Sequence, residues 1–192
     1  MATSPEGSEH IARWAASRGM FFQRHPDLAW FQAWEPFDTM VSGTVYYNAA
    51  SFTVGTSQIT LAEPWVGLED SEPLARTVLA FCVDPRFTLR VAARGGEHFN
   101  TRVSFLENAK MPTVALGDPD WDEHMTTLAA SPSEAQRALP LGARQHLAHL
   151  GFAGHLEVRP GGLVLHFAGT LPTVDHYERL SRVTPEVVRA FR

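Results

Sequence analysis

Two histidines offer the first candidate chemistry in this chain. His146 and His149 lie three residues apart in a segment with a helical pattern, so both imidazoles project toward one shared ligand position. Asp122, Glu123 and His124 add oxygen and nitrogen atoms of the kinds that bind zinc. The two histidines, however, flank the apolar side of the predicted helix, and their spacing alone is common. We therefore interpret them as surface side chains and predict neither a bound metal nor a cofactor.

A second candidate is the pair formed by His166 and Glu157, which approach each other on the polar side of a predicted hairpin. A neighbouring carboxylate raises a histidine pKa and can create a general base or a pH sensor. The alternative is an ordinary solvated pair between two strands. We favour the solvated pair, and expect His155, Glu157 and His166 to be more exposed than the apolar residues of the hairpin.

Nucleophilic and phosphate chemistry have little support in the sequence. The single cysteine, Cys82, lies in the apolar run TVLAFCV, which predicts a buried and inert thiol. No GxSxG motif is present. The pairs Gly95-Gly96 and Gly161-Gly162 are each placed between two strands, whereas a phosphate loop precedes a helix. We predict no catalytic residues.

Three aromatic residues form the most distinctive feature that does not suggest catalysis. Trp30, Phe31 and Trp34 lie between Pro26 and Pro36, which limit any helix there to one or two turns. Such a cluster often covers a core, but tryptophan is also enriched at interfaces. We predict that at least one of the three rings stays exposed and contacts a protein partner or a second copy of the chain.

The elements that position these residues are clearest in the second half of the chain. Ser131, Pro132 and Glu134 have the spacing of a capped helix start, and Gly151 ends a helical segment that is interrupted by Pro140. A hairpin follows, for which we predict a Gly161-Gly162 loop that pairs three sets of residues: Arg159 with Val164, Val158 with Leu165 and Leu156 with Phe167. This register places the apolar residues together on one face: Leu156, Val158, Leu163, Leu165 and Phe167.

The middle of the chain is predicted to form mainly β-strands. Five segments are rich in β-formers or alternate in polarity: residues 40–47, 52–62, 77–83, 87–93 and 99–105. A short helix is the alternative for residues 77–83. Gly55 is interpreted as a bulge. Helical patterns occupy residues 4–19 and the segment from Val174 onward. The fold class that follows is α+β, with a mainly antiparallel sheet and N-terminal, central and C-terminal helices. We predict one domain, 1–192, with possible sub-parts 1–106 and 121–192.

Length and charge narrow the functional classes. The chain has 192 residues, of which 44% are hydrophobic and 19% are charged, as in a folded globular protein. Its net charge of -5 and its scattered basic residues argue against a nucleic-acid partner. No apolar run approaches the roughly 20 residues of a membrane helix, and the first ten residues do not resemble a signal peptide. We expect a soluble, cytoplasmic protein without direct membrane insertion.

Several short motifs carry a family resemblance. They are RGMFF at 18–22, Phe99-Asn100, Trp121-Asp122 and SPSEA at 131–135, followed by the hairpin and the amphipathic terminal helix. The chain resembles a soluble domain of uncharacterised bacterial proteins that often adjoins membrane-spanning helices. This resemblance covers most of the chain and implies no catalytic residues. The chain departs from the membrane-attached members because it has no spanning segment.

Two functional hypotheses remain. The first is a non-enzymatic protein-binding or scaffold module, because the structural signals are complete and no catalytic set accompanies them. The alternative is a small-molecule-binding domain or enzyme with a pocket lined by aromatic residues and histidines. An exposed apolar patch favours the first hypothesis. A deep cavity with at least two converging ionisable groups favours the second.

Overall fold

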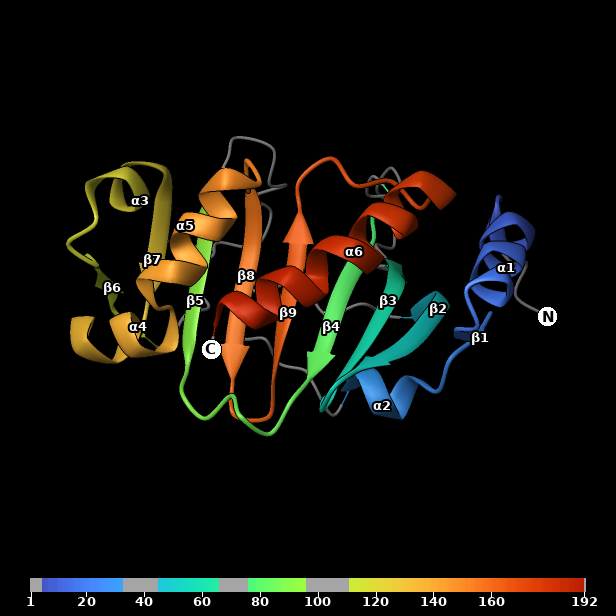
Figure 1. The fold of residues 1–192 in the computed structure, drawn as a ribbon, viewed down its shortest axis with the longest axis horizontal. Helices are drawn as coiled ribbons and strands as arrows, with labels where there is room; N and C mark the ends of the chain where they lie inside the picture. The colour runs from blue at the N-terminus through green and yellow to red at the C-terminus, as the bar shows by residue number, and fades with distance from the viewer. Residues whose placement is uncertain (1–4, 33–44, 66–75, 96–110, 192) are drawn as a thin grey trace, which may run out of the picture.

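One sheet of nine strands organises the fold, and helices lie along it (Figure 1). A computed structural model of the protein describes residues 5–32, 45–65, 76–95 and 111–191. Every pairing between neighbouring strands is antiparallel, in the order β1-β2-β3-β4-β9-β8-β5-β7-β6. The expected α+β class, with a mainly antiparallel sheet and N-terminal, central and C-terminal helices, is confirmed.

The strands and helices have the following bounds. The strands are β1 Phe21–Gln23, β2 Val45–Val54, β3 Ser57–Trp65, β4 Leu79–Val83, β5 Val91–Gly95, β6 Thr113–Val114, β7 Met125–Leu128, β8 Gly154–Arg159 and β9 Gly162–Phe167. The helices are α1 Ser8–Ser17, α2 Leu28–Gln32, α3 Pro119–His124, α4 Pro132–Ala138, α5 Leu141–His149 and α6 Val174–Ala190.

The main core lies between the sheet and the helices in front of it in Figure 1. Leu156 and Val158 of β8 and Leu163 and Leu165 of β9 meet buried side chains from α1, α5 and α6 there, including Leu147. The opposite face of the sheet carries a second cluster, in which Val164 and Phe81 pack with Phe31 of α2. Both faces are therefore covered over the central strands.

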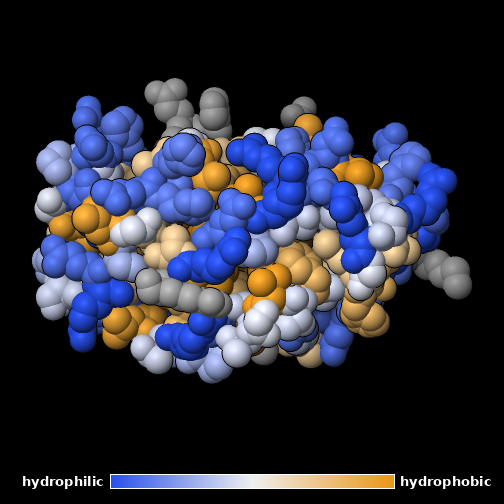
Figure 2. Space-filling view, viewed as in Figure 1, coloured by the Kyte–Doolittle hydropathy of each residue, from blue (hydrophilic) through white to orange (hydrophobic). Residues whose placement is uncertain are grey.

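The helix-covered face has no broad apolar area. Figure 2 shows blue, hydrophilic side chains across its middle, with orange residues in small separate groups. The exposed positions of α6 are Asp175, Arg179, Arg182, Glu186 and Arg189, which carry both signs of charge. This face is therefore a mixed, hydrophilic surface.

The predicted helix boundaries in the second half are confirmed. The Ser131 side chain accepts a hydrogen bond of 3.2 Å from the Glu134 N–H, and Pro132 occupies the first turn of α4. Gly151, at φ +62°, follows α5, and its N–H donates to the Ala148 carbonyl. These local signals lie within a few residues of the structure that they specify.

The predicted hairpin register is wrong by two residues. Arg159 pairs with Gly162 and Val158 with Leu163, so the loop consists of Pro160 and Gly161. Gly161 has φ +92°, which glycine adopts at the third position of a turn that has proline at the second. A shift of two residues keeps every side chain on its face, because the sheet repeats every two residues. The apolar set is accordingly buried together as expected.

The predicted strand over residues 52–62 is also wrong. Phe52 belongs to β2, Ile59 belongs to β3, and Gly55 at φ +62° lies in the turn between them. The apolar pattern changes face there because the chain reverses direction. The bulge lies instead between Tyr47 and Ala50, where Asn48 has φ +53°. The strand expected at 99–105 lies outside the described residues.

Candidate functional site

A buried group of charged and polar side chains crosses the middle of the sheet, on the face opposite α5 and α6. The strand register produces it, because Arg94 of β5 pairs with His155 of β8, and His155 pairs with His166 of β9. Glu157 lies two residues along β8 and therefore faces the same side. We refer to Arg94, His155, Glu157 and His166 as the central charged cluster.

Polar contacts connect Arg94, His155 and Glu157 within the central charged cluster, and His166 contacts a neighbouring threonine. Arg94 Nε donates to His155 Nδ1 at 3.4 Å, and His155 Nε2 lies 3.6 Å from Glu157 Oε2. His166 Nε2 lies 2.7 Å from the hydroxyl of Thr77. The acceptor role of His155 Nδ1 fits a neutral ring that carries its proton on Nε2.

The predicted exposure of this region is wrong for two of its three residues. His155 and Glu157 are both 0% exposed, whereas His166 is half-buried and, as predicted, more exposed than the apolar residues of the hairpin. β8 lies between β5 and β9 at the centre of the sheet, where both of its faces are covered. The polar residues of the hairpin are therefore interior groups, which need partners within the fold.

Burial determines the protonation of the two imidazoles. It lowers the pKa of His155 well below 6.5, and the neighbouring Arg94 charge lowers that pKa further. The pKa of His166 falls to about 4 for the same two reasons, burial being the larger. Burial also lowers the pKa of Arg94 to about 10, although Glu157 opposes this change. At neutral pH both imidazole rings are therefore neutral.

A second buried polar network connects α6, β2 and β3. Glu63, 0% exposed, receives hydrogen bonds from Arg76 Nε at 2.5 Å and from Trp65 Nε1 at 3.0 Å. Asn48 Nδ2 donates to the other carboxylate oxygen at 3.2 Å. The hydroxyl of Tyr177 donates to the Asn48 carbonyl at 2.9 Å, and burial raises the pKa of that hydroxyl well above 10. This network anchors the terminal helix to the left-handed residue of the bulge.

A surface hollow lies beside this second network, at the starts of α1 and α6. Its volume is about 330 Å³. Arg76 reaches it from the Glu63 network and also donates to the Glu6 carbonyl at 2.9 Å. The residues that line the hollow are Glu6, Gly7, His10, Ile11, Arg76, Pro172, Thr173 and Val174. Among the described residues, the lining thus contains one histidine and no Phe, Tyr or Trp, unlike the pocket considered in the alternative hypothesis.

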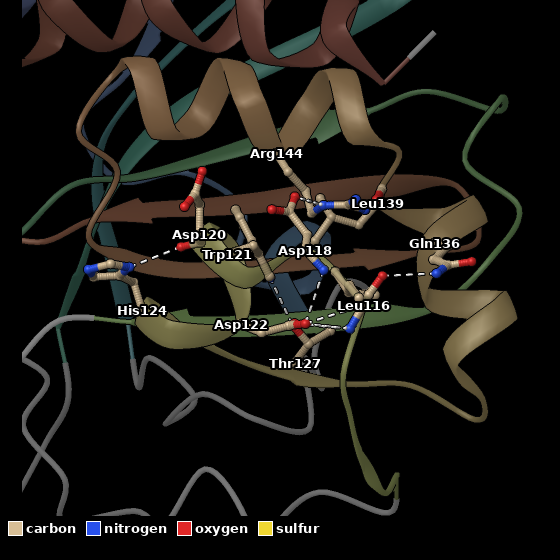
Figure 3. Close-up of polar contacts among 11 residues, drawn as sticks. Leu116, Asp118, Asp120, Trp121, Asp122, His124, Thr127, Gln136, Leu139 and Arg144 are labelled. Carbon is tan, nitrogen blue, oxygen red and sulfur yellow. Dashed lines mark hydrogen bonds and ion pairs between the residues drawn. The ribbon is translucent and has the colours of Figure 1, made fainter.

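Two of the residues considered as metal ligands, Asp122 and His124, make other contacts. Figure 3 shows Asp122 accepting from the N–H groups of Leu116, Gly117 and Asp118, so its carboxylate holds the loop before α3. The ring of His124 lies 2.9 Å from the Asp120 carbonyl. Over residues 5–32, 45–65, 76–95 and 111–191, no three His, Cys, Asp or Glu side chains gather as a metal site would require.

The same region contains a structural ion pair that the sequence did not reveal. Arg144 of α5 donates to Asp118 Oδ2 and to the Leu139 carbonyl, both at 2.8 Å (Figure 3). Trp121 Nε1 donates to the hydroxyl of Thr127 at 3.0 Å. These bonds fix α3 and the α4–α5 connection against β7. The acidic segment at 118–123 therefore serves mainly to position neighbouring elements.

The three aromatic residues predicted to contact a partner lie in different surroundings. Phe31 is 1% exposed and stacks on Tyr46, with ring centroids 4.1 Å apart. Trp30 is half-buried and packs edge-on against Phe31 and Phe81. Trp34 lies outside the described residues. The contact surface accordingly stays a prediction that concerns Trp30 and Trp34, whereas Phe31 belongs to the second core.

Sequence reasoning missed Arg94, Thr77 and the Glu63–Arg76 pair. Arg76 follows an acidic segment and has no periodic pattern that points to Glu63. A weak signal existed for the central charged cluster, because the hairpin alternates polar and apolar residues while its strands are rich in β-formers. That alternation does not reveal which side of the sheet is covered.

Comparison with known proteins gives a likeness of fold. No family model matches the sequence, and no curated protein matches it. A crystal structure of the mycobacterial trehalose monomycolate transport factor A, TtfA, is similar with a TM-score of 0.59. The match covers 97% of each chain at 12% sequence identity. At this identity the likeness concerns the fold alone.

Proposed function

We propose that this protein is a non-enzymatic protein-binding or scaffold module, and that its contact surface lies where α2 packs at the end of the sheet formed by β1, β2 and β3. One observation carries the proposal. Of the five large apolar side chains that are exposed among the described residues, three lie on the first three strands: Phe21 at 64%, Val45 at 38% and Trp65 at 38%. Half-buried Trp30 lies at the same end of the sheet.

The placement of the ionisable groups supports a role without catalysis. His155, Glu157 and Glu63 are fully buried and bonded within the fold. An enzyme requires such groups to meet at a place that a substrate can reach. The surface hollow at α1 and α6 is lined by none of these three residues.

The structural neighbour bears on the fold. TtfA is named as a transport factor, and a shared fold does not imply a shared function. The proposal for this chain includes a bacterial origin, a cytoplasmic location and a partner that is a protein and not a nucleic acid. In the described residues, none of the helices has the length and apolar character needed to cross a membrane.

The test is purification from the native host with a tagged chain, comparing wild type with Trp30→Ala and Trp34→Ala. Leu141→Ala is the matched control, because Leu141 is 52% exposed but lies on α5. We expect both tryptophan variants to lose the partners that wild type retains, with melting temperatures near that of wild type. Full retention of the same partners by both variants would reject the Trp30–Trp34 surface.

The surface hollow supports a second candidate function, the binding of a small molecule. Its volume of about 330 Å³ lies within the range of known ligand pockets, roughly 300–1,000 Å³. Val174→Trp would fill the hollow with a larger side chain at the start of α6. Native mass spectrometry of the purified protein checks this candidate: a bound small molecule present in wild type and absent from Val174→Trp supports it, and an unliganded wild type argues against it.

A further inference from the structure

The surface hollow at the starts of α1 and α6 has an apolar wall beside a single arginine. Ile11 of α1, Pro172 and Val174 of α6 supply the apolar wall. Arg76 is the only lysine or arginine among the described residues that line the hollow. Such a lining suits a small molecule that has an apolar body and one polar group.

A buried carboxylate holds Arg76 in one orientation. Its Nε donates to Glu63 Oε1 at 2.5 Å, and its Nη2 donates to Glu63 Oε2 at 3.0 Å. Nη2 also donates to the Glu6 carbonyl at 2.9 Å. The hydrogen bonding to Glu63 is the main cause that raises the pKa of Arg76, so the guanidinium stays charged. Arg76 is therefore an oriented cation that loses little side-chain freedom when it binds a ligand.

The third guanidinium nitrogen, Nη1, can still donate. Within the described part of the chain Nη1 makes no hydrogen bond, and the Arg76 side chain is 32% exposed. Glu63 does not depend on Arg76 alone, because Trp65 Nε1 and Asn48 Nδ2 donate to the same carboxylate. The Glu6 side chain is exposed, so water screens its charge. Arg76 thus retains two N–H groups for a molecule in the hollow.

We propose that the surface hollow binds a small carboxylic acid in its ionised form, with the carboxylate on Arg76 Nη1 and the hydrocarbon chain against the apolar wall. A guanidinium bonds more strongly to a carboxylate than to a neutral oxygen. An amine would instead meet the like charge of Arg76. This inference rests on the second candidate function, the binding of a small molecule in the hollow, and it names the class of ligand.

Hexanoate is the test ligand, and three related compounds separate its chemical parts. Hexanamide has a similar chain without the charge, hexylammonium reverses the charge, and acetate keeps the carboxylate without the long chain. Each compound is titrated into the purified full chain at pH 7.5 and constant ionic strength, up to roughly 50 mM, because so small a ligand binds weakly. NMR chemical shifts follow the backbone amides of Gly7 and Val174 and the Nε–H of Arg76, all from residues that line the hollow.

We expect hexanoate to shift these signals and to bind at least about tenfold more tightly than hexanamide or acetate, with no saturable binding of hexylammonium. Val174→Trp fills the hollow without changing Arg76 or Glu63, and should abolish the binding. Leu141→Trp is the matched control, because Leu141 is exposed on α5 and does not line the hollow. Arg76→Lys keeps a cation beside Glu63 but lacks the Nη1 donors, so it should bind hexanoate no better than hexanamide.

Two kinds of result would overturn the inference. The first is equal binding of hexanoate and hexanamide, or no saturable shift with hexanoate. The second is hexanoate binding that Val174→Trp leaves unchanged, because the acid would then bind elsewhere. Native mass spectrometry separates this failure from that of the candidate function. A neutral molecule bound to wild type and absent from Val174→Trp would keep small-molecule binding and reject the carboxylic acid, whereas an unliganded wild type that also fails to bind hexanoate would reject both.

Discussion

The two sides of β8 differ in chemistry although both are buried. Leu156 and Val158 enter the main core beneath the helices, whereas His155 and Glu157, equally buried, join Arg94 on the other side. Apolar side chains are stabilised by close packing, which does not require a specific orientation. Each buried charged group must instead have a partner within the fold. Alternation of polarity therefore identifies which side chains share a face, but it does not show whether that face is open to water.

The largest expected effect is on the apolar side. Leu165→Ala should lower the free energy of unfolding by about 2–5 kcal/mol, because Leu165 is 1% exposed and its removal leaves a cavity in the main core. Urea denaturation at pH 7.5 measures the change. A loss below about 1 kcal/mol would show that the core collapses around the site, and the contrast between the two sides would then be weaker than we infer.

The second prediction concerns pH and the charged side. The folded pKa of His166 is about 4, below its ordinary value of 6.5, so the unfolded chain binds more protons between these values. Stability contributed by the neutral ring is present above pH 6.5 and is lost as pH falls from 6.5 toward 4. The loss from this residue reaches up to about 3 kcal/mol.

Urea denaturation of wild type and His166→Gln from pH 7.5 to pH 4 tests whether stability falls in this direction. Subtracting one series from the other removes the titration of carboxylates that both proteins share. Wild type should lose more stability than the variant on acidification. If the variant loses as much as wild type, then His166 titrates normally in the fold, and burial on this side has been overstated.

The third prediction concerns Val164, a buried apolar residue on the same side of the sheet as the central charged cluster. Val164 follows Leu163 on β9, lies on the side opposite to the main core and is 1% exposed. Val164→Ala should cost about 1–3 kcal/mol, from the lost methyl groups and the cavity that they leave. A cost near zero in thermal or urea unfolding would mean that this side is open to solvent, as the polar pattern of the hairpin had suggested.

The helix caps and the division of the hairpin into two faces could be predicted from the sequence, because both depend on residues that are close together in the chain. Ser131 and Glu134 are three positions apart, and each contributes to the same first turn. The division into faces survived an incorrect turn, because moving the pairing by two residues changes partners without changing sides. Gly161-Gly162 seemed the better turn, but Pro160-Gly161 fits a two-residue loop with one residue at positive φ.

The burial of the charged side could not be predicted in the same way, because it depends on distant segments. Arg94 reaches His155 only after β5 and β8 have paired, across 61 positions of sequence. Phe31 likewise becomes core because α2 packs against Tyr46 and Phe81. The short aromatic run itself did not distinguish a core position from a contact surface.

The smallest expected effect is at the edge of the central charged cluster, where Thr77 contacts His166 at 2.7 Å. Thr77→Val keeps the shape of the side chain but removes the hydroxyl, so His166 Nε2 loses this partner. A hydrogen bond of this kind contributes about 0.5–1.5 kcal/mol to stability, and we expect a loss in that range in urea. The contact from Thr77 to the Thr170 hydroxyl, at 3.2 Å, is lost as well.

The double variant Thr77→Val with His166→Gln separates the two contributions: if only the histidine contact matters, the valine change should cost much less in the His166→Gln background. Equal costs in both backgrounds would show that the Thr77 hydroxyl contributes through Thr170. Its contact with His166 would then add nothing to stability.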